Sequence, residues 1–234
     1  MKFSIIFDNY NYDSNLHSLW GFSSLIETND GETILFDTGS NGRVLLSNAK
    51  KMNIDFKKIN TLFISHSHWD HIGGLDTIIE ENPNITLIIP SSLSKHLQRD
   101  LKSLVKKVII IDENFTQISD TLYSTGLLGT QMPEQSLIIK QNNKIYLISG
   151  CSHAGIDTIA NTAQTNLNLP IYYIIGGFHM MYKKREEIEK ITQNLTTKYI
   201  TASHCTGDLG IKIIKEKYQE NFIDGGVGKI IKFP

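Results

Sequence analysis

The sequence predicts an α/β fold in which short strands and helices alternate through both halves of the chain. Runs of β-branched and apolar residues bounded by turn signals indicate the strands, and segments with helical periodicity lie between them. No linker rich in Pro, Gly or Ser divides the 234 residues, so we expect a single domain over residues 1–234. The pattern fits two packed sheets flanked by helices, and it fits one doubly wound sheet equally well.

The expected strands share a short apolar run that ends at a turn or glycine. They are Lys2–Phe7, Phe22–Glu27, Glu32–Phe36, Thr61–Ser65, Thr86–Ile89, Lys107–Ile111, Ser136–Lys140, Lys144–Ser149, Ile171–Ile175, Tyr199–Ala202 and Lys229–Lys232. The expected helices are Arg43–Met52, Leu75–Glu81, Ser91–Val105, Asp157–Thr165, Lys184–Leu195 and Leu209–Tyr218. Two hairpins are predicted, across Asn29-Asp30-Gly31 and across Gln141–Lys144.

Composition and charge narrow the class of protein. The net charge is −1 and the cations are scattered, so a concentrated basic face for nucleic acid is not expected. No run approaches the length of a membrane span, and Asp8 and Asn9 interrupt the apolar start too early for a secretory signal. Two cysteines, Cys151 and Cys205, make no disulfide framework. We therefore expect a cytoplasmic protein without a nucleic-acid or membrane partner.

Several histidines follow directly after predicted strands, where rigid scaffolds present catalytic groups. His66 and His68 follow one strand, and His153, His179 and His204 each follow another. Glycine or other small residues accompany most of them. This recurrence indicates that the side chains converge at one site.

The densest cluster is the segment 65–74, Ser-His-Ser-His-Trp-Asp-His-Ile-Gly-Gly. In extended backbone alternate side chains face the same way, so His66 and His68 can bind one ion together. Asp70 and His71 follow at the turn into the next helix and can address a second ion. Imidazole with carboxylate suits Zn, and also Mn, Fe or Ni. The pattern predicts two divalent metal ions, and a sulfur ligand at Cys151 would shift the preference toward Zn.

His66-x-His68-x-Asp70-His71 resembles the signature of the metallo-β-lactamase superfamily. Residues 34–39, Ile-Leu-Phe-Asp-Thr-Gly, resemble its first motif, in which the aspartate, here Asp37, supports the site without being a ligand. Residues 144–151 resemble the strand that ends in a bridging aspartate or, in some β-lactamases, a cysteine. Ser203-His204 resembles the last metal-binding histidine. The resemblance implies a four-layer αββα sandwich with the metals at one edge of the sheets.

Three further segments narrow the resemblance to a prokaryotic branch of metal-dependent hydrolases. They are Gly150–Ile156, Ile175–His179 and His204–Gly207, and the branch includes the archaeal dihydropterin-methyl ribofuranosylaminobenzene phosphate synthases. Most of the superfamily's hydrolases carry a histidine in a turn before the strand 144–149. Residues 124–130 contain none here. We therefore expect His153 to complete the ion held by His66 and His68.

The other candidate site residues have different expected roles. His204 is expected to ligate the second ion with Asp70 and His71. Cys151 either ligates or bridges the ions or is a small buried residue. His179 contacts substrate or transfers protons, binds metal, or is structural. His17 and His96 are assigned no role.

A two-metal site makes hydroxide available at neutral pH and polarises the substrate oxygen. Asp70 would hold ion and water in register, and Asp37 would orient an imidazole. The sequence therefore predicts a dinuclear metal-dependent hydrolase that uses a metal-activated water on a small phosphoester or cyclic phosphodiester. The alternatives are a metal-assisted transferase like the pterin-condensing synthases, an iron oxygenase or oxidoreductase, and a non-catalytic metal-binding protein.

The expected partner is a small-molecule substrate. Its pocket walls are expected from Tyr10–Trp20, Gln131–Gln135 and Phe178–Tyr182, which hold aromatic residues and few cations. The sequence does not choose the substrate, the native metal or the oligomeric state.

Overall fold

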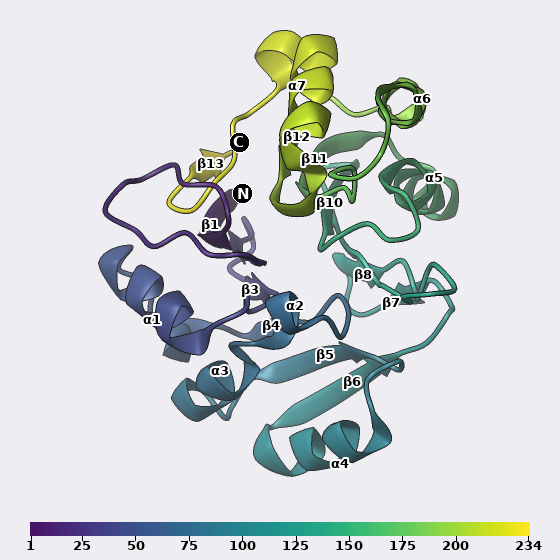
Figure 1. Ribbon diagram of the computed structural model, residues 1–234. Coiled ribbons are helices and arrows are strands. Elements are labelled where there is room, and N and C mark those ends of the chain that lie inside the picture. The colour runs from purple at the N-terminus through teal and green to yellow at the C-terminus, as the bar shows by residue number, and fades with distance from the viewer. The chain divides into compact units, whose positions relative to one another are not determined.

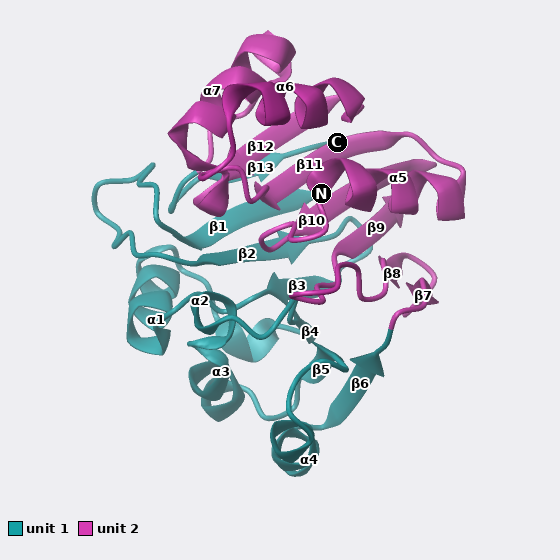
Figure 2. Cartoon of the chain, turned by 45° about the vertical axis from the view of Figure 1, so that its right-hand side comes forward, with its two compact units in different colours: residues 1–112, 226–234 teal, residues 113–225 magenta.

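The computed structural model describes all residues from 1 to 234 and divides into two units. Unit 1 holds residues 1–112 and 226–234, drawn in teal in Figure 2, and unit 2 holds residues 113–225, drawn in magenta. Each unit contains one sheet and the helices that pack on it. The single domain expected over residues 1–234 stays a prediction.

Unit 1 contains a seven-stranded mixed sheet in the order β13-β1-β2-β3-β4-β5-β6. Its strands are β1 Lys2–Asp8, β2 Phe22–Glu27, β3 Thr33–Phe36, β4 Thr61–Phe63, β5 Thr86–Pro90, β6 Lys107–Ile111 and β13 Ile230–Lys232. The pairs β13/β1, β1/β2 and β2/β3 are antiparallel, whereas β3 to β6 run parallel. The ends of β3 and β4 therefore lie side by side.

The helices of unit 1 pack on this sheet through apolar side chains. They are α1 Gly42–Lys51, the short α2 Trp69–Ile72, α3 Leu75–Glu81 and α4 Lys95–Leu104, with a 3-10 turn at Phe56–Lys58 (Figure 1). Leu45 of α1 and Ile78 of α3 are fully buried in one cluster with Leu62 of β4. Full burial of each such side chain contributes about 1.5–3 kcal/mol.

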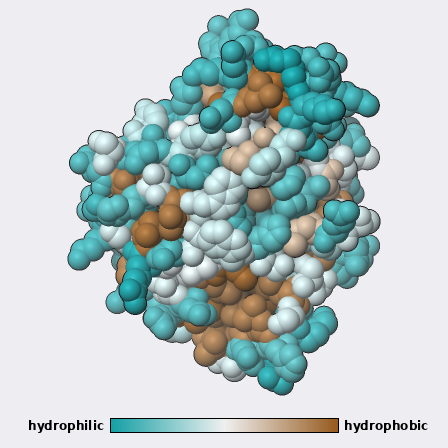
Figure 3. All heavy atoms as spheres, viewed as in Figure 1, coloured by the Kyte–Doolittle hydropathy of each residue, from teal (hydrophilic) through white to brown (hydrophobic).

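The outer strand β6 leaves part of this sheet apolar at the surface. Figure 3 shows a brown patch low in the view, where Figure 1 places β5 and β6. Val108, Ile109 and Ile110 of β6 are half-buried, and the neighbouring Leu104 is exposed.

Unit 2 contains a six-stranded mixed sheet in the order β12-β11-β10-β9-β8-β7. Its strands are β7 Thr116–Gln117, β8 Leu122–Ser124, β9 Leu137–Gln141, β10 Lys144–Ser149, β11 Ile171–Gly177 and β12 Tyr199–Ser203. The β9–β10 hairpin turns through Asn142 and Asn143, both with positive φ, as a two-residue turn of type I′ requires. β10, β11 and β12 are parallel, so their carboxyl ends meet at one edge.

Three helices cover the sheet of unit 2. They are α5 Ile156–Leu167, α6 Arg185–Asn194 and α7 Gly207–Tyr218, with 3-10 turns at His204–Thr206 and Gln219–Asn221. Ile159 of α5, Ile188 of α6 and Ile214 of α7 share a buried cluster with Leu147 and Ile174 of the strands. This core fixes the strand ends from which the unit's histidines project.

Two sheets, each packed against its own helices, confirm the α/β class and rule out a single doubly wound sheet. Both predicted hairpins form. The sequence prediction missed β7, β8 and the short helix α2. It also carried β4 through to Ser65, whereas the strand ends at Phe63 because the Ser65 N–H donates to the Asp37 side chain. No helix is both long and apolar enough to span a membrane.

Candidate metal centre

In unit 1 the candidate site begins where β3 and β4 end side by side. Phe36 pairs with Phe63, and the chain then places Asp37 after β3 and Ser65 after β4. The Asp37 carboxylate is fully buried and accepts hydrogen bonds from the Ser65 N–H at 2.7 Å and the Ser65 hydroxyl at 2.6 Å. Asp37 thus links the two strand ends directly beneath the histidine motif.

The same carboxylate sets the orientation of His71. Asp37 Oδ2 lies 2.7 Å from His71 Nδ1, and both side chains are fully buried. A carboxylate only accepts hydrogen bonds, so the proton of a neutral His71 ring sits on Nδ1. His71 Nε2 then keeps its lone pair, which is the arrangement of a metal-binding histidine.

Ser65 carries this orientation on to His66. The single hydroxyl hydrogen of Ser65 is donated to Asp37, so Ser65 Oγ accepts from His66 Nδ1 across 2.8 Å. His66 Nε2 is thereby the unprotonated nitrogen. One buried carboxylate fixes the tautomers of two histidines, one directly and one through a serine.

The Nε2 atoms of His66 and His71 each lie at a ligand-like separation from a neighbouring donor atom. His66 Nε2 is 3.0 Å from His68 Nδ1, and His71 Nε2 is 3.7 Å from Asp70 Oδ2. Two nitrogen ligands 2.0–2.1 Å from one tetrahedral ion lie about 3.3 Å apart. Each pair therefore lies at a separation suited to two ligands of a divalent cation.

Burial raises the pKa of the Asp37 carboxyl, while the neighbouring His71 and the hydrogen bonds from His71 and Ser65 oppose this rise. The three hydrogen bonds that this carboxylate accepts offset the free-energy cost of burying it.

The loop after β3 also fixes the backbone of the histidine motif. The Thr38 hydroxyl donates to the His71 carbonyl at 2.9 Å and accepts from the Gly74 N–H at 3.1 Å. At Gly73 a Cβ atom would lie 2.3 Å from the Ser40 carbonyl oxygen, so only glycine permits this approach. The motif is therefore held at the C-terminal end of α2.

In unit 2 the candidate residues follow three parallel strands. Cys151 and His153 follow β10, His179 follows β11, and His204 follows β12. His179 and His204 have φ near +50°, and Ser152 has φ +61°. Strained backbone of this kind costs roughly 1–3 kcal/mol per residue and clusters at functional sites. The three strand ends thus bring their polar side chains to one edge of the sheet.

Two of these side chains already form a ligand-like pair. Cys151 Sγ lies 3.4 Å from His204 Nε2, and both residues are buried. Sulfur and nitrogen ligands of one tetrahedral Zn²⁺ lie about 3.6 Å apart. The rings of His153 and His179 are also neighbours, with centroids 4.5 Å apart.

Glu134 holds the loop that carries Cys151 and His153. Its buried carboxylate accepts from the backbone N–H groups of Gly150 at 3.0 Å, Cys151 at 2.8 Å and Ser152 at 3.1 Å through Oε1. Its Oε2 accepts from the His153 N–H at 2.9 Å. Four consecutive N–H groups thus converge on one side chain. The sequence analysis missed this role, because backbone donors leave no trace in the sequence.

Cys205 is the second residue that the sequence left without a role. Burial raises the pKa of its thiol, but hydrogen bonding with Cys151, the charge of the adjacent His204 and hydrogen bonding with His179 outweigh burial, so the pKa lies well below its ordinary value. The same contact with Cys205 raises the pKa of His179, against the opposing effect of burial. Cys205 and His179 therefore interact closely.

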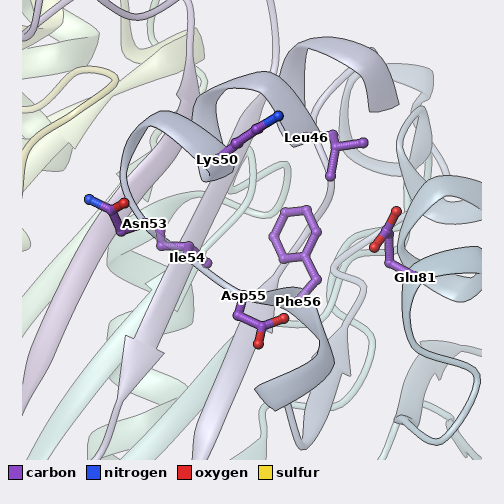
Figure 4. Close-up of a pocket in the computed structure, with 7 residues that line it drawn as sticks. All are labelled: Leu46, Lys50, Asn53, Ile54, Asp55, Phe56 and Glu81. Carbon is purple, nitrogen blue, oxygen red and sulfur yellow. The ribbon is translucent and has the colours of Figure 1, made fainter.

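A pocket in unit 1 is lined by residues that include no histidine. It has a volume of about 390 Å³ and is lined by Leu46, Lys50, Asn53, Ile54, Asp55, Phe56 and Glu81 (Figure 4). These residues come from α1, α3 and the connection between α1 and β4. The lining offers neither histidine nor cysteine, so this pocket is no candidate for metal chemistry.

The structure thus assembles the predicted residues in two sets. In unit 1 Asp37, His66, His68, Asp70 and His71 come together as expected. In unit 2 Cys151 lies beside His204, and His153 lies beside His179. Their roles as ligands or catalytic groups stay predictions.

The chain belongs to the metallo-beta-lactamase superfamily, whose sequence profile matches residues 21–136. It is 30% identical to 7,8-dihydropterin-6-methyl-4-(beta-D-ribofuranosyl)-aminobenzene-5'-phosphate synthase of Methanocaldococcus jannaschii, over 95% of this chain and 92% of that protein. This match confirms the family and the branch that the sequence motifs indicated.

Two other relatives place the chain more broadly. A structure described as Tm1679, a metal-dependent hydrolase of the beta-lactamase superfamily, superposes with a TM-score of 0.81 at 24% identity, over 100% of this chain and 99% of that one. Ribonuclease Z of Alkaliphilus oremlandii is 30% identical over 51% of this chain and 36% of its own length. The fold is thus that of the metallo-β-lactamase family, and the superfamily implies the use of divalent metal.

Proposed function

We propose that the protein is a dinuclear metal-dependent hydrolase that acts on a small phosphoester or cyclic phosphodiester. The observation that carries the proposal is the hydrogen-bonded chain in unit 1, in which Asp37 orients His71 directly and His66 through Ser65. It prepares imidazole nitrogens to bind cations.

We propose two sets of ligands for the two ions. His66, His68 and His153 hold one ion, and Asp70, His71 and His204 hold the other, with Cys151 beside His204. That the sets from the two units serve one pair of ions rests on the family resemblance. The separations within each unit support the ligands proposed from that unit. His66 Nε2 lies 3.0 Å from His68 Nδ1, and Cys151 Sγ lies 3.4 Å from His204 Nε2.

Bound divalent ions lower the pKa of a coordinated water to near neutrality and polarise the phosphoryl oxygen. Asp70 orients the attacking water and accepts its proton. The water oxygen forms a bond to phosphorus while the bond to the leaving oxygen breaks. His179 then donates a proton to that leaving oxygen, and its raised pKa favours the protonated form that this role requires.

The proposed substrate is small and is not a nucleic acid. The chain has a net charge of −1 and scattered cations, which argues against a strong phosphate-backbone interface. Similarity to ribonuclease Z supports phosphodiester chemistry in the superfamily, and the metal-dependent hydrolase Tm1679 supports hydrolysis on this fold.

The test compares wild type with His68→Ala on bis-p-nitrophenyl phosphate. Protein purified without chelator is analysed for metals per chain and assayed in the same preparation. We expect close to two equivalents of Zn, Mn or Ni in the wild type. In the variant we expect about one equivalent fewer and turnover lower by about 100-fold or more, because a ligand has been removed.

His96→Ala is the matched control, since His96 is exposed on α4 in the same unit. It should retain both metal content and turnover. Mostly iron in the wild type, or tightly bound metal without hydrolysis, would contradict the hydrolase and favour the oxygenase or the transferase.

A metal-assisted transferase is the second candidate. It is favoured by the 30% identity to the phosphate synthase of Methanocaldococcus jannaschii over most of both chains. Incubation with a reduced pterin donor and ribofuranosylaminobenzene phosphate, followed by mass spectrometry, separates the two. Condensed product without phosphodiester turnover would establish the transferase.

A further inference from the structure

Unit 2 contains a group of donors of which two, Cys205 and His179, are not ligands in the proposed dinuclear centre. Cys205 and His179 converge with Cys151, and one ligand atom from each lies within 4.8 Å of the other two. Both thiols are buried, whereas His179 is exposed. Two sulfur atoms and one imidazole nitrogen are donors that soft and borderline cations prefer.

The separations are close to those of a real site. Two sulfur ligands of one tetrahedral Zn²⁺ lie about 3.8 Å apart, and a sulfur and a nitrogen about 3.6 Å. Atoms within 4.8 Å of one another need to shift by about 1 Å or less to share an ion. With three protein ligands and one solvent-facing side, the fourth position stays open for water.

The backbone holds these donors close together before any ion binds. At Gly177 a Cβ atom would lie 2.7 Å from Cys205 Sγ, so the thiol packs directly against the end of β11. The His179 N–H points at the same sulfur from 3.4 Å. Cys151 is tied through its own N–H to the Glu134 carboxylate. The donors therefore come from three strand ends whose loops are already fixed.

Charges of both signs act on His179. The buried carboxylate of Glu134 raises the pKa of His179, and Lys183 lowers it more strongly.

We propose that Cys151, His179 and Cys205 form a third metal site, selective for a soft or borderline divalent cation such as Zn²⁺. The ion binds more weakly than the dinuclear pair, because one ligand is exposed and Cys151 is shared with His204. When the site is filled, His179 has no proton to transfer, so excess zinc inhibits turnover. This last consequence rests on the proposed function, whereas the site itself does not.

The binding test uses the full chain under reductant, dialysed against excess Zn²⁺ and analysed for metal per chain. We expect three equivalents in the wild type and two in Cys205→Ser and in His179→Ala. Each variant should bind the third ion at least about tenfold more weakly. His179 is exposed, so its replacement leaves the packing intact and guards against a folding defect in the cysteine variant.

Reconstitution with Co²⁺ reports the thiolates directly. The near-ultraviolet charge-transfer band from sulfur to Co²⁺ should fall by about half in Cys205→Ser, and it should persist in His68→Ala, which affects only the dinuclear pair. Equal zinc content and equal bands in the wild type and Cys205→Ser would overturn the site.

The activity test is separate from the binding test. If the phosphodiester assay succeeds, excess zinc should inhibit wild type and leave the residual turnover of Cys205→Ser unaffected. If the wild type binds a third equivalent of zinc without inhibition, the result supports the metal site and contradicts proton transfer by His179. Loss of the third equivalent in a chain without turnover would support the site and contradict the hydrolase.

Discussion

The two units prepare ligands by opposite means. In unit 1 the candidate ligands His66 to His71 lie within one short segment, and the carboxylate of Asp37 bonds to the side chains of His71 and Ser65 and to one backbone N–H, that of Ser65. In unit 2 the candidates are spread over three strand ends, and the carboxylate of Glu134 bonds to the backbone from Gly150 to His153.

This difference separates two functions of a buried carboxylate. Asp37 decides where the protons of two imidazoles lie, so its loss should act on metal affinity. Glu134 satisfies four N–H groups of one loop, so its loss should act first on stability and only then on the ligands that the loop carries. Each carboxylate supports candidate ligands in its own unit, and the two do so by different physical routes.

The largest effect is expected from Glu134→Ala. It leaves four N–H donors without their acceptor in a buried loop, and each such donor costs about 1–3 kcal/mol. We expect the free energy of unfolding to fall by about 3 kcal/mol or more, measured by denaturant titration. Glu216→Gln, at an exposed position on α7, should change it by less than about 0.5 kcal/mol. A loss below about 1 kcal/mol for Glu134→Ala would remove the distinction between the two carboxylates.

A smaller effect, of a different kind, is expected from Asp37→Asn. The amide keeps the shape of the side chain but no longer accepts at both positions, so the tautomers of His71 and His66 are no longer fixed. We expect metal affinity to fall by about 10–100-fold, measured by competition with a chromophoric chelator. Asp76→Asn, exposed on α3, is the control. Unchanged affinity together with a large loss of stability would show that Asp37 acts as Glu134 does.

The smallest effect is expected at Glu32, a carboxyl that holds no site together. Burial, and then the charge of Asp30, raise the pKa of Glu32 above 4.5 in the folded state. The stability that it contributes is therefore fully present below pH 4.5 and is lost as the pH rises through the folded value. We expect Glu32→Gln to be more stable than wild type at pH 7 by less than about 1 kcal/mol.

The Glu32 difference should shrink to nothing near pH 4, as followed by thermal unfolding at the two pH values. Glu80→Gln, exposed on α3, should show no such pH dependence. A variant less stable than wild type at pH 7 would reverse the sign of this prediction.

The sequence was most informative where the candidate residues are close together along the chain. The spacing of residues 66–71 predicted that their side chains cluster, because alternate side chains of an extended backbone point the same way. Strand-ending histidines also predicted which elements would supply His153, His179 and His204, since parallel strands end at a common edge. Most predicted strands and helices formed within one or two residues of the expected bounds, or within a few in the case of α4.

What could not be predicted depends on contacts distant in sequence. The Glu134 side chain lies sixteen or more residues from the backbone N–H groups that donate to it, and such groups are common to nearly every residue type. Cys205 acquires its partners through the approach of β11 and β12, which no local pattern encodes. The short strands β7 and β8 are two and three residues long, too short for any periodicity to show.

The strand β13, which flanks β1 at one edge of the first sheet, comes from residues far later in the sequence. β13 pairs with β1, through Phe3 and Ile231 among others, and the Met1 amino group donates to the Phe233 carbonyl at 2.8 Å. Synthesis runs from the amino end, so β1 leaves the ribosome more than two hundred residues before its neighbour does. Throughout that interval β1 has an open edge that other chains can pair with. A chain in synthesis therefore carries this open strand edge until residues 230–232 have been made.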